Sequence, residues 1–253
     1  MARRTKEAAA NTREQLLDAA ERVFRASGVS GSTLAQVAAD AGVTRGALYW
    51  HFRDKADLYA AMCARATLPL ETMFERAGAT SHADPLATLR ELALAALARL
   101  ACDPRAQAVF DVMFHKSERT ANVAPMAERE RRERCDCLLH VERVLVQAVD
   151  RGQLPPDTDT ALAARAMHAY IEGIMDQWVL DPAAFDLAAV APALIDSMLA
   201  GLRAAPPRLR SPMPTGKKRP RATRVATRAL PANHPRAQAR AVAQRAKGRR
   251  GRA

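Results

Sequence analysis

The sequence predicts an all-α protein with an N-terminal helix-turn-helix domain of three helices, a longer C-terminal helical domain and a disordered basic C-terminal tail. Three observations support this class. Apolar residues recur three and four positions apart through most of residues 12–203, which is the spacing of one face of a helix. Residues typical of helix starts precede these stretches, and glycine follows several of them. No segment has the alternating apolar and polar pattern of a half-buried strand.

The first predicted helix begins at Thr12, because Thr12 and Gln15 have the spacing of a capping box. The apolar residues between Leu16 and Phe24 fall on one side of this helix, and Gly28 ends it. We expect the helix to brace the two short helices that follow.

Two short helices separated by a turn come next. Thr33 and Gln36 form a second capping box, and Gly42 provides the turn. The apolar residues of the second short helix share its buried side. This spacing leaves on or beside the opposite surface Arg45, Gly46, Tyr49 and Trp50. An exposed Tyr and Trp either pack on a neighbouring element or are available to a partner.

A long helix is predicted to start at the N-cap Asp54 and to continue to residue 68, where Pro69 interrupts or bends it. Pro69 therefore has two interpretations, a hinge or a simple helix stop. Pro192 falls inside the last helix, where we expect a kink or a late start. The remaining predicted helices cover residues 85–101, 104–116, 125–151, 160–180 and 186–203.

The run from Gly42 to Leu58 closely resembles the DNA-binding domain of TetR-type transcriptional repressors. Two further blocks are similar to the AcrR and TtgR group of multidrug-efflux repressors within that family. The first comprises residues 114–116 with Glu118, and the second comprises residues 170–173 with Trp178. The resemblance extends over about residues 10 to 203 and is strongest up to about residue 60.

This resemblance implies three parts: a DNA-binding domain at 10–56, a helical ligand-binding and dimerisation domain at 57–204, and a disordered basic tail at 205–253. It implies a homodimer that represses multidrug efflux pump genes and leaves its palindromic operator when a small hydrophobic ligand binds. An alternative is an architectural, non-specific DNA binder driven by the basic tail. An enzyme is not expected, because the sequence contains no Gly-rich phosphate loop and no nucleophile elbow.

Side-chain chemistry assigns the expected DNA contacts. Arg45 has the geometry to bind guanine O6 and N7, and Gly46 lets the helix approach the base pairs. Tyr49 and Trp50 offer apolar surface to thymine methyl groups or sugars. For His51, a capping or packing role is an equal alternative. The expected phosphate contacts are Thr33, Thr44, His51 and Lys55.

The expected ligand pocket consists mainly of apolar side chains from the second domain, although residues with this spacing are commonly just core. Asp176 or His115 would orient a cationic or hydrogen-bonding ligand. The candidate pocket residues are Leu89, Leu92, Ala96, Phe110, Phe114, Ile171, Met175 and Asp176.

The last two helices carry more apolar surface than one partner helix needs. A second copy of the chain would bury this surface in a four-helix interface, which agrees with the homodimer that the resemblance implies. The alternative is that both faces pack inside one monomer.

Charge separates a nearly neutral body from a basic tail. Of the 39 Lys and Arg residues, 15 lie at 205–253, where there is no Asp or Glu, which leaves 24 basic against 27 acidic residues in 1–204. The tail also lacks Phe, Trp and Tyr, so it cannot bury enough apolar surface to fold. It either contacts DNA phosphates without sequence preference or simply increases solubility.

The remaining features predict a cytoplasmic, nucleoid-associated protein without metal or cofactor. The basic start of the chain is not followed by the apolar segment of a secretion signal, and no apolar run approaches the length of a membrane span. Four cysteines are expected as reduced thiols. Cys135, Cys137 and His140 suggest a metal site only weakly, because helix positions 135 and 137 point about 200° apart.

Overall fold

The structure is a computed structural model that describes residues 2–117 and 124–208. Within these ranges the chain is helical and contains no β-sheet, which confirms the predicted all-α class. The expected disordered tail lies outside the described residues from residue 209 onward.

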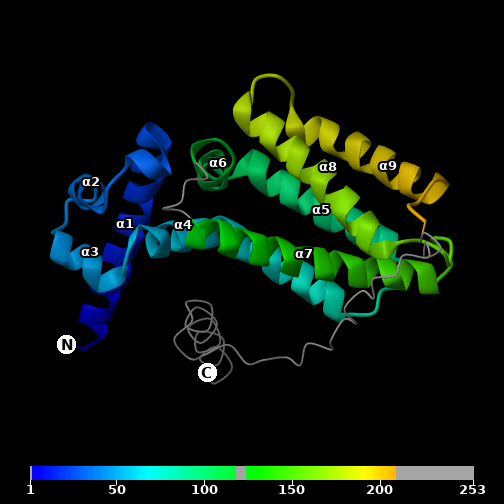
Figure 1. Ribbon diagram of the computed structural model, residues 1–253, viewed down its shortest axis with the longest axis horizontal. Coiled ribbons are helices and arrows are strands. Elements are labelled where there is room, and N and C mark those ends of the chain that lie inside the picture. The colour runs from blue at the N-terminus through cyan, green and yellow to red at the C-terminus, as the bar shows by residue number, and fades with distance from the viewer. Residues whose placement is uncertain (1, 118–123, 209–253) are drawn as a thin grey trace, which may run out of the picture. The chain divides into compact units, whose positions relative to one another are not determined.

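Three N-terminal helices form a small domain at one end of α4 (Figure 1). Six helical elements follow α4 and complete the body. The N-terminal helices are α1 (Ala2–Gly31), α2 (Leu34–Asp40) and α3 (Arg45–His51), and the others are α4 (Lys55–Ala79), α5 (Pro85–Cys102), α6 (Pro104–Asp111), η1 (Val112–Lys116), α7 (Ala124–Asp150), α8 (Thr160–Leu180) and α9 (Leu187–Ala204).

The start predicted for the first helix is wrong. The helix α1 begins at Ala2, and the Thr12 hydroxyl donates to the Ala8 carbonyl at 3.0 Å within the helix. The predicted stop is confirmed, because Gly28 has φ +70° and ψ 161° and breaks the regular helix. A left-handed φ of this kind favours glycine.

Proline does not interrupt the two helices in which an effect was expected. The helix α4 continues ten residues beyond Pro69 to Ala79, so the interpretation of Pro69 as a helix stop is wrong. The helix α9 starts at Leu187 and continues through Pro192, so the late start is also wrong. Both prolines are exposed, where water can bind the carbonyl that has lost its N–H donor.

The segment predicted as one helix over 104–116 divides into two parts. The α-helix α6, capped by Asp103, ends at Asp111, and η1 continues as a turn of π-helix to Lys116. A π-helical turn is wider than an α-helical turn and is frequent at functional sites.

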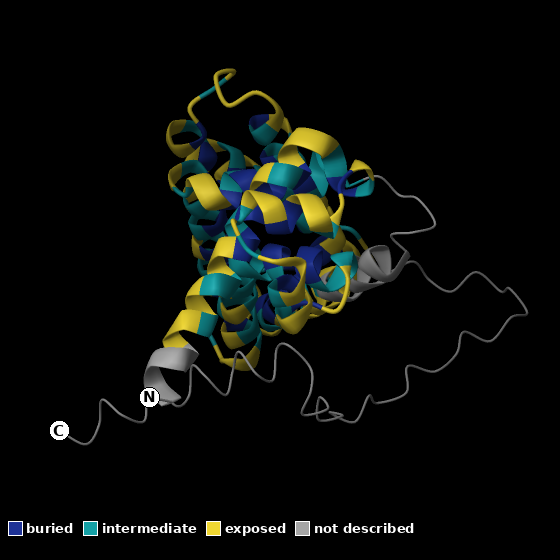
Figure 2. Ribbon diagram, turned by 90° about the vertical axis from the view of Figure 1, so that its left-hand side faces the viewer, coloured by how far each residue is buried: buried dark blue, intermediate teal, exposed yellow. Residues whose placement is uncertain are grey.

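In the body α4 packs against α7, α8 packs mainly against α7, and α9 packs against α5 (Figure 1). Buried residues lie on the inward faces of these helices, and exposed residues cover the outward faces (Figure 2). The chain stays attached to the body after α9, because the Asp159 amide donates to the Pro207 carbonyl at 2.8 Å and Arg208 pairs with Asp157. The described body therefore extends to residue 208, past the boundary expected at 204.

Candidate functional site

The first helix of the predicted DNA-binding pair has a complete capping box. The Thr33 amide donates to Gln36 Oε1 at 2.7 Å, and the Gln36 amide donates to Thr33 Oγ1 at 3.2 Å. Val37 and Ala38 are buried, and the chain then turns at Gly42, whose φ is +66°. The predicted capping box and glycine turn are confirmed.

The next helix, α3, presents its polar and aromatic side chains outward. Thr44 caps it by accepting a hydrogen bond from the Ala47 amide at 3.1 Å, and Leu48 anchors it in the core. The Trp50 residue is 73% exposed and Tyr49 is 50% exposed. These values exclude the alternative that the two rings are buried on a neighbouring element of the described chain.

The polar residues of α3 are accessible as well. Arg45, at the first position of α3, is exposed and forms no ion pair within the part of the chain that the structure describes. Gly46 is exposed, with only Thr44 Oγ1 within 4 Å of where a Cβ would lie. Thr33 and Thr44 are both exposed, although their hydroxyl oxygens also cap helices.

His51 closes α3 beside the core. Its ring lies edge-on to Trp50 with centroids 4.6 Å apart. Burial, followed by the nearby charge of Arg13, lowers the pKa of His51 below its ordinary value. This position fits the packing role that was the alternative to a phosphate contact, and the neutral ring keeps one N–H to donate.

Lys55 has a different role from the expected phosphate contact. Its ammonium donates to the carbonyls of Val29, Ser30 and Ser32 at 2.6, 3.2 and 2.9 Å. An ammonium has three N–H donors, so these contacts use them all. Lys55 therefore binds the carbonyl end of α1 and fixes it to the start of α4, which corrects the expectation.

Two sets of ion pairs hold the small domain in place. Arg22 on α1 donates to Asp40 at the end of α2 through two nitrogens, at 2.9 and 2.7 Å. Arg65 on α4 is 11% exposed and lies 2.6 Å from Asp18 and 3.3 Å from Glu21. Burial raises the pKa of Glu21 despite the nearby arginine charge. The sequence analysis assigned none of these contacts.

A cavity of about 600 Å³ lies within the helical body, between α4, α5, α7 and α8, with α6 and η1 at one end. The structure brings seven of the eight predicted pocket residues into its lining: Leu89, Ala96, Phe110, Phe114, Ile171, Met175 and Asp176. Leu92 is the exception and packs in the hydrophobic core. The cavity side of α5 is formed by residues 89, 93 and 96, and position 92 lies off that side.

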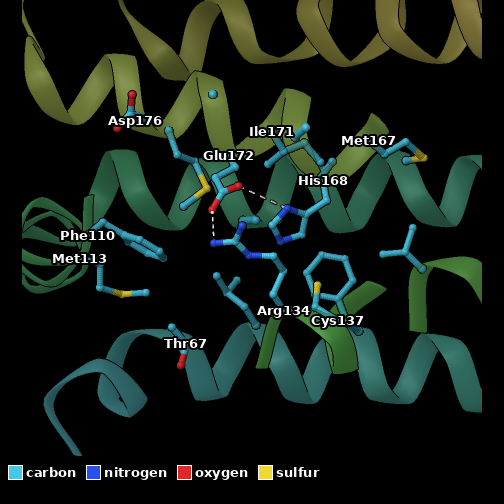
Figure 3. Close-up of a pocket in the computed structure, with 18 of the residues that line it drawn as sticks. Thr67, Phe110, Met113, Arg134, Cys137, Met167, His168, Ile171, Glu172 and Asp176 are labelled. Atoms are coloured by element: carbon cyan, nitrogen blue, oxygen red, sulfur yellow. Dashed lines mark ion pairs between the residues drawn. The ribbon is translucent and has the colours of Figure 1, made fainter. Parts of the chain in front are cut away.

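Charged side chains cross the middle of the cavity, and the sequence analysis did not identify them. Arg134 Nη2 lies 3.4 Å from Glu172 Oε1, and His168 Nδ1 lies 3.6 Å from Glu172 Oε2. Figure 3 shows these three side chains pointing toward one another, with Asp176 apart from them. The spacing of His168 and Glu172, four residues apart on one helix, was the available sequence signal.

Burial also determines the protonation of two groups in this lining. Desolvation is the main reason that the pKa of His168 is lowered, so this ring is neutral at pH 7. Burial raises the pKa of the Cys137 thiol to about 11, with smaller contributions from Glu71 and Glu172. Cys137 is therefore a protonated thiol at neutral pH. Cys135 is exposed, and the described residues contain no cluster suited to a metal ion.

A capped helical pair with an exposed second helix, joined to a helical body that encloses an apolar cavity with polar groups, defines a helix-turn-helix regulator with a ligand-sensing domain. Residues 16–62 match the family described as bacterial regulatory proteins, tetR family. Residues 84–204 match the C-terminal region of MAATS-type transcriptional repressors.

Individual proteins give the same assignment. The chain is 37% identical over 206 residues to the transcriptional regulator TtgR of Pseudomonas putida, covering 81% of this chain and 98% of TtgR. NalD, the secondary repressor of the MexAB-OprM multidrug efflux pump in Pseudomonas aeruginosa, has a similar structure, with a TM-score of 0.70, 34% identity and coverage of 77% and 97%. SmeT of Stenotrophomonas maltophilia in complex with triclosan gives a TM-score of 0.69, 33% identity and coverage of 81% and 100%. The chain belongs to the TetR family and is a transcriptional repressor of that family.

Proposed function

We propose that this protein is a dimeric repressor of multidrug efflux pump genes that binds a palindromic operator through α3 and releases it when a small apolar ligand enters the cavity. The observation that carries the proposal is the exposure of Trp50 and Tyr49 beside Arg45 on a short capped helix. Large apolar rings held in water on a rigid surface are typical of a binding site.

Each exposed residue of α3 has a role in this proposal. Arg45 binds guanine through two hydrogen bonds, and Gly46 allows α3 to approach the floor of the major groove. Tyr49 and Trp50 contact thymine methyl groups and sugars. Thr44 donates its hydroxyl proton to a phosphate while its oxygen caps α3, and His51 donates its single N–H. Thr33 donates its hydroxyl proton to Gln36 Oε1 at 2.9 Å in the free protein, so a phosphate contact there requires that the proton leave this partner.

The outward faces of α8 and α9 support a homodimer. Along α8 the exposed positions include Leu162, Ala166, Tyr170 and Leu180. The helix α9 is long and apolar enough to cross a membrane by length and composition, and 28% of it is buried in the monomer. We assign this apolar surface to a four-helix interface with a second copy, which would place two α3 helices about 34 Å apart in successive major grooves.

The cavity supports an effector of drug-like size. Its volume of about 600 Å³ is within the range of small-molecule pockets, and its lining combines aromatic, thioether and aliphatic groups with a few charged ones. SmeT is described in complex with triclosan. The described roles of NalD and SmeT as repressors of multidrug efflux pumps support genes of the same kind as targets here. We place the protein with the chromosome in the cytoplasm and propose no catalytic turnover.

A footprint of the DNA upstream of the protein's own gene tests the proposal. Wild-type protein should protect a palindrome, and Arg45→Ala should lose that protection at the same salt concentration. Arg53→Ala, which removes an exposed arginine after α3, is the matched control. Equal protection by wild type and Arg45→Ala would remove Arg45 from base recognition, and the absence of any protected palindrome would overturn operator binding.

The basic segment of residues 209–253 favours a second candidate, a non-specific DNA binder. Truncation after Arg208 separates the two functions. The repressor requires that truncation reduces the salt dependence of binding and keeps the preference for the operator. The non-specific binder requires that truncation abolishes DNA binding.

A further inference from the structure

Four polar side chains form a continuous series from the cavity to the DNA-binding domain. Asp176, in the cavity lining on α8, lies 3.2 Å from Nε2 of His115 on η1. Nδ1 of the same ring lies 3.2 Å from Oδ1 of Asp111, the last residue of α6. Nε of Arg25 on α1 donates to the other oxygen of Asp111 at 3.3 Å. Each residue belongs to a different helical element.

The two central members are sheltered from solvent. The side chains of Asp111 and His115 are each 20% exposed, whereas those of Arg25 and Asp176 are 55% and 49% exposed. Charges in the sheltered centre are screened less than charges on the surface. The series is therefore sheltered from solvent where η1 joins α6, and its two ends remain open to the cavity and to the surface of α1.

The π-helical turn that carries His115 also connects the two domains through packing. Met113 and Phe114 on η1 line the cavity. The backbone carbonyl of Lys116, at the other end of the same turn, lies 3.6 Å from where a Cβ on Gly28 would be placed. One turn of the chain thus forms a wall of the cavity and contacts α1 beside the Gly28 break.

We propose that the series Arg25–Asp111–His115–Asp176 transmits the state of the cavity to the DNA-binding domain. This inference rests on the proposed function and assigns the residues through which it is regulated. A ligand group that pairs with Asp176 competes with His115 for that carboxylate. The His115 ring lies 3.2 Å from both Asp176 and Asp111, so the loss of its contact with Asp176 lets the ring shift against Asp111, and Asp111 in turn orients Arg25.

A double-mutant cycle on the full-length protein tests the series without a ligand. Asp176→Asn and Arg25→Gln should each weaken binding to the operator duplex about threefold or more, because each loosens the orientation of α1 before DNA binds. The double variant should bind the operator duplex no more weakly than the single variant with the lower affinity. Distant residues that share no network have additive effects on the free energy of binding. A loss of affinity in the double variant equal to the product of the two single fold-losses would therefore overturn the proposal.

Two matched variants serve as controls. Glu172→Gln removes another carboxylate from the same cavity, one helical turn before Asp176, whose partners are Arg134 and His168. Arg22→Gln removes an arginine of α1 that pairs with Asp40 inside the DNA-binding domain. Glu172→Gln combined with Arg25→Gln, and Arg22→Gln combined with Asp176→Asn, should both be additive.

Thermal unfolding of the same variants gives a second cycle that is independent of DNA. The shifts of Tm for Asp176→Asn and Arg25→Gln should be non-additive. If wild type binds no duplex, the proposed function fails while the unfolding cycle still decides whether cavity and α1 are coupled. Coupling in unfolding together with additive operator affinities would make the series purely structural and would overturn transmission to DNA binding.

Discussion

At the scale of single residues, a substitution at Gly46 should have opposite effects on stability and on DNA binding. A Cβ at this position meets only Thr44 Oγ1, at 3.8 Å, so the isolated protein has room for it. Gly46→Ala should therefore raise the free energy of unfolding by about 0.5–1 kcal/mol, because alanine is the better helix former. The same methyl group should weaken operator binding if α3 lies against the base pairs. Urea unfolding and a duplex titration measure the two effects, and unchanged operator affinity would contradict the close approach.

Lys55 provides the opposite case, a basic residue near the DNA-binding surface with a structural role. Lys55→Met should lower the free energy of unfolding by about 2 kcal/mol, because the carbonyls of Val29, Ser30 and Ser32 lose a charged donor. The dependence of DNA affinity on salt should stay the same. A phosphate contact would instead reduce the slope of log K against log salt by about 1. Arg53→Ala, at an exposed position, should leave the free energy of unfolding nearly unchanged.

At the scale of elements, α4 and α7 approach each other closely at Gly78. A Cβ there would lie 3.1 Å from the Cα and the carbonyl oxygen of His140, and the backbone cannot move aside as a flexible side chain would. Gly78→Ala should destabilise the protein by about 1–3 kcal/mol through overpacking. Gly173→Ala, with open space beside it on α8, is the matched control and should be neutral or stabilising. Chemical unfolding of both variants distinguishes packing from helix propensity.

The two capping boxes explain how far local sequence determines an element. Thr33 follows the kink at Gly28 and the end of α1 at Gly31, so its box starts α2 as predicted. Thr12 follows Glu7 to Ala10, which are good helix formers, and the helix continues through it. The hydroxyl then bonds back to the Ala8 carbonyl, an arrangement that competes with capping. The same signal therefore gives a helix start only where the preceding residues cannot be helical.

The two candidate sites were predictable to different degrees, because the DNA-binding surface lies on one helix and the cavity is formed by several. The exposure of Arg45, Tyr49 and Trp50 follows from the spacing of apolar residues on a single short helix. The cavity depends on how six elements meet, so Leu92 and Ala93, neighbours on one apolar helix, could not be told apart by periodicity. Arg134 could not be assigned either, because its partner Glu172 lies on another helix.

At the scale of the whole molecule, the proposed dimer gives a test on the outward face of α8. Ala166 is exposed in the monomer, so Ala166→Arg should leave the fold intact. The added charge should prevent the close packing of two α8 helices, which would lower the mass measured by analytical ultracentrifugation to that of a monomer and weaken operator binding. Ala98→Arg, at an exposed position on α5, is the control. A variant that remains dimeric would exclude this face from the interface.

The stability of the protein should depend on pH through its partly buried histidines. Burial is the largest cause that lowers the pKa of His51, His140 and His168 below 6.5. Near pH 6.5 these histidines therefore bind more protons in the unfolded chain than in the folded chain. Because protonation favours the unfolded state, the free energy of unfolding falls as the pH drops below about 6.5. His168→Gln should reduce that fall between pH 7 and pH 5, as measured by urea unfolding at each pH. An identical pH profile for the variant would contradict the assignment.

The two tryptophans give each half of the molecule its own optical reporter. Trp50 is in water on α3, whereas Trp178 is 7% exposed and donates its indole N–H to the Phe185 carbonyl at 3.2 Å. The sequence contains only these two. The emission of Trp50 should resemble that of free indole and respond to a bound duplex, and the emission of Trp178 should be shifted to the blue. Replacement of one tryptophan at a time by phenylalanine would let intrinsic fluorescence follow events at the operator and in the sensing domain separately.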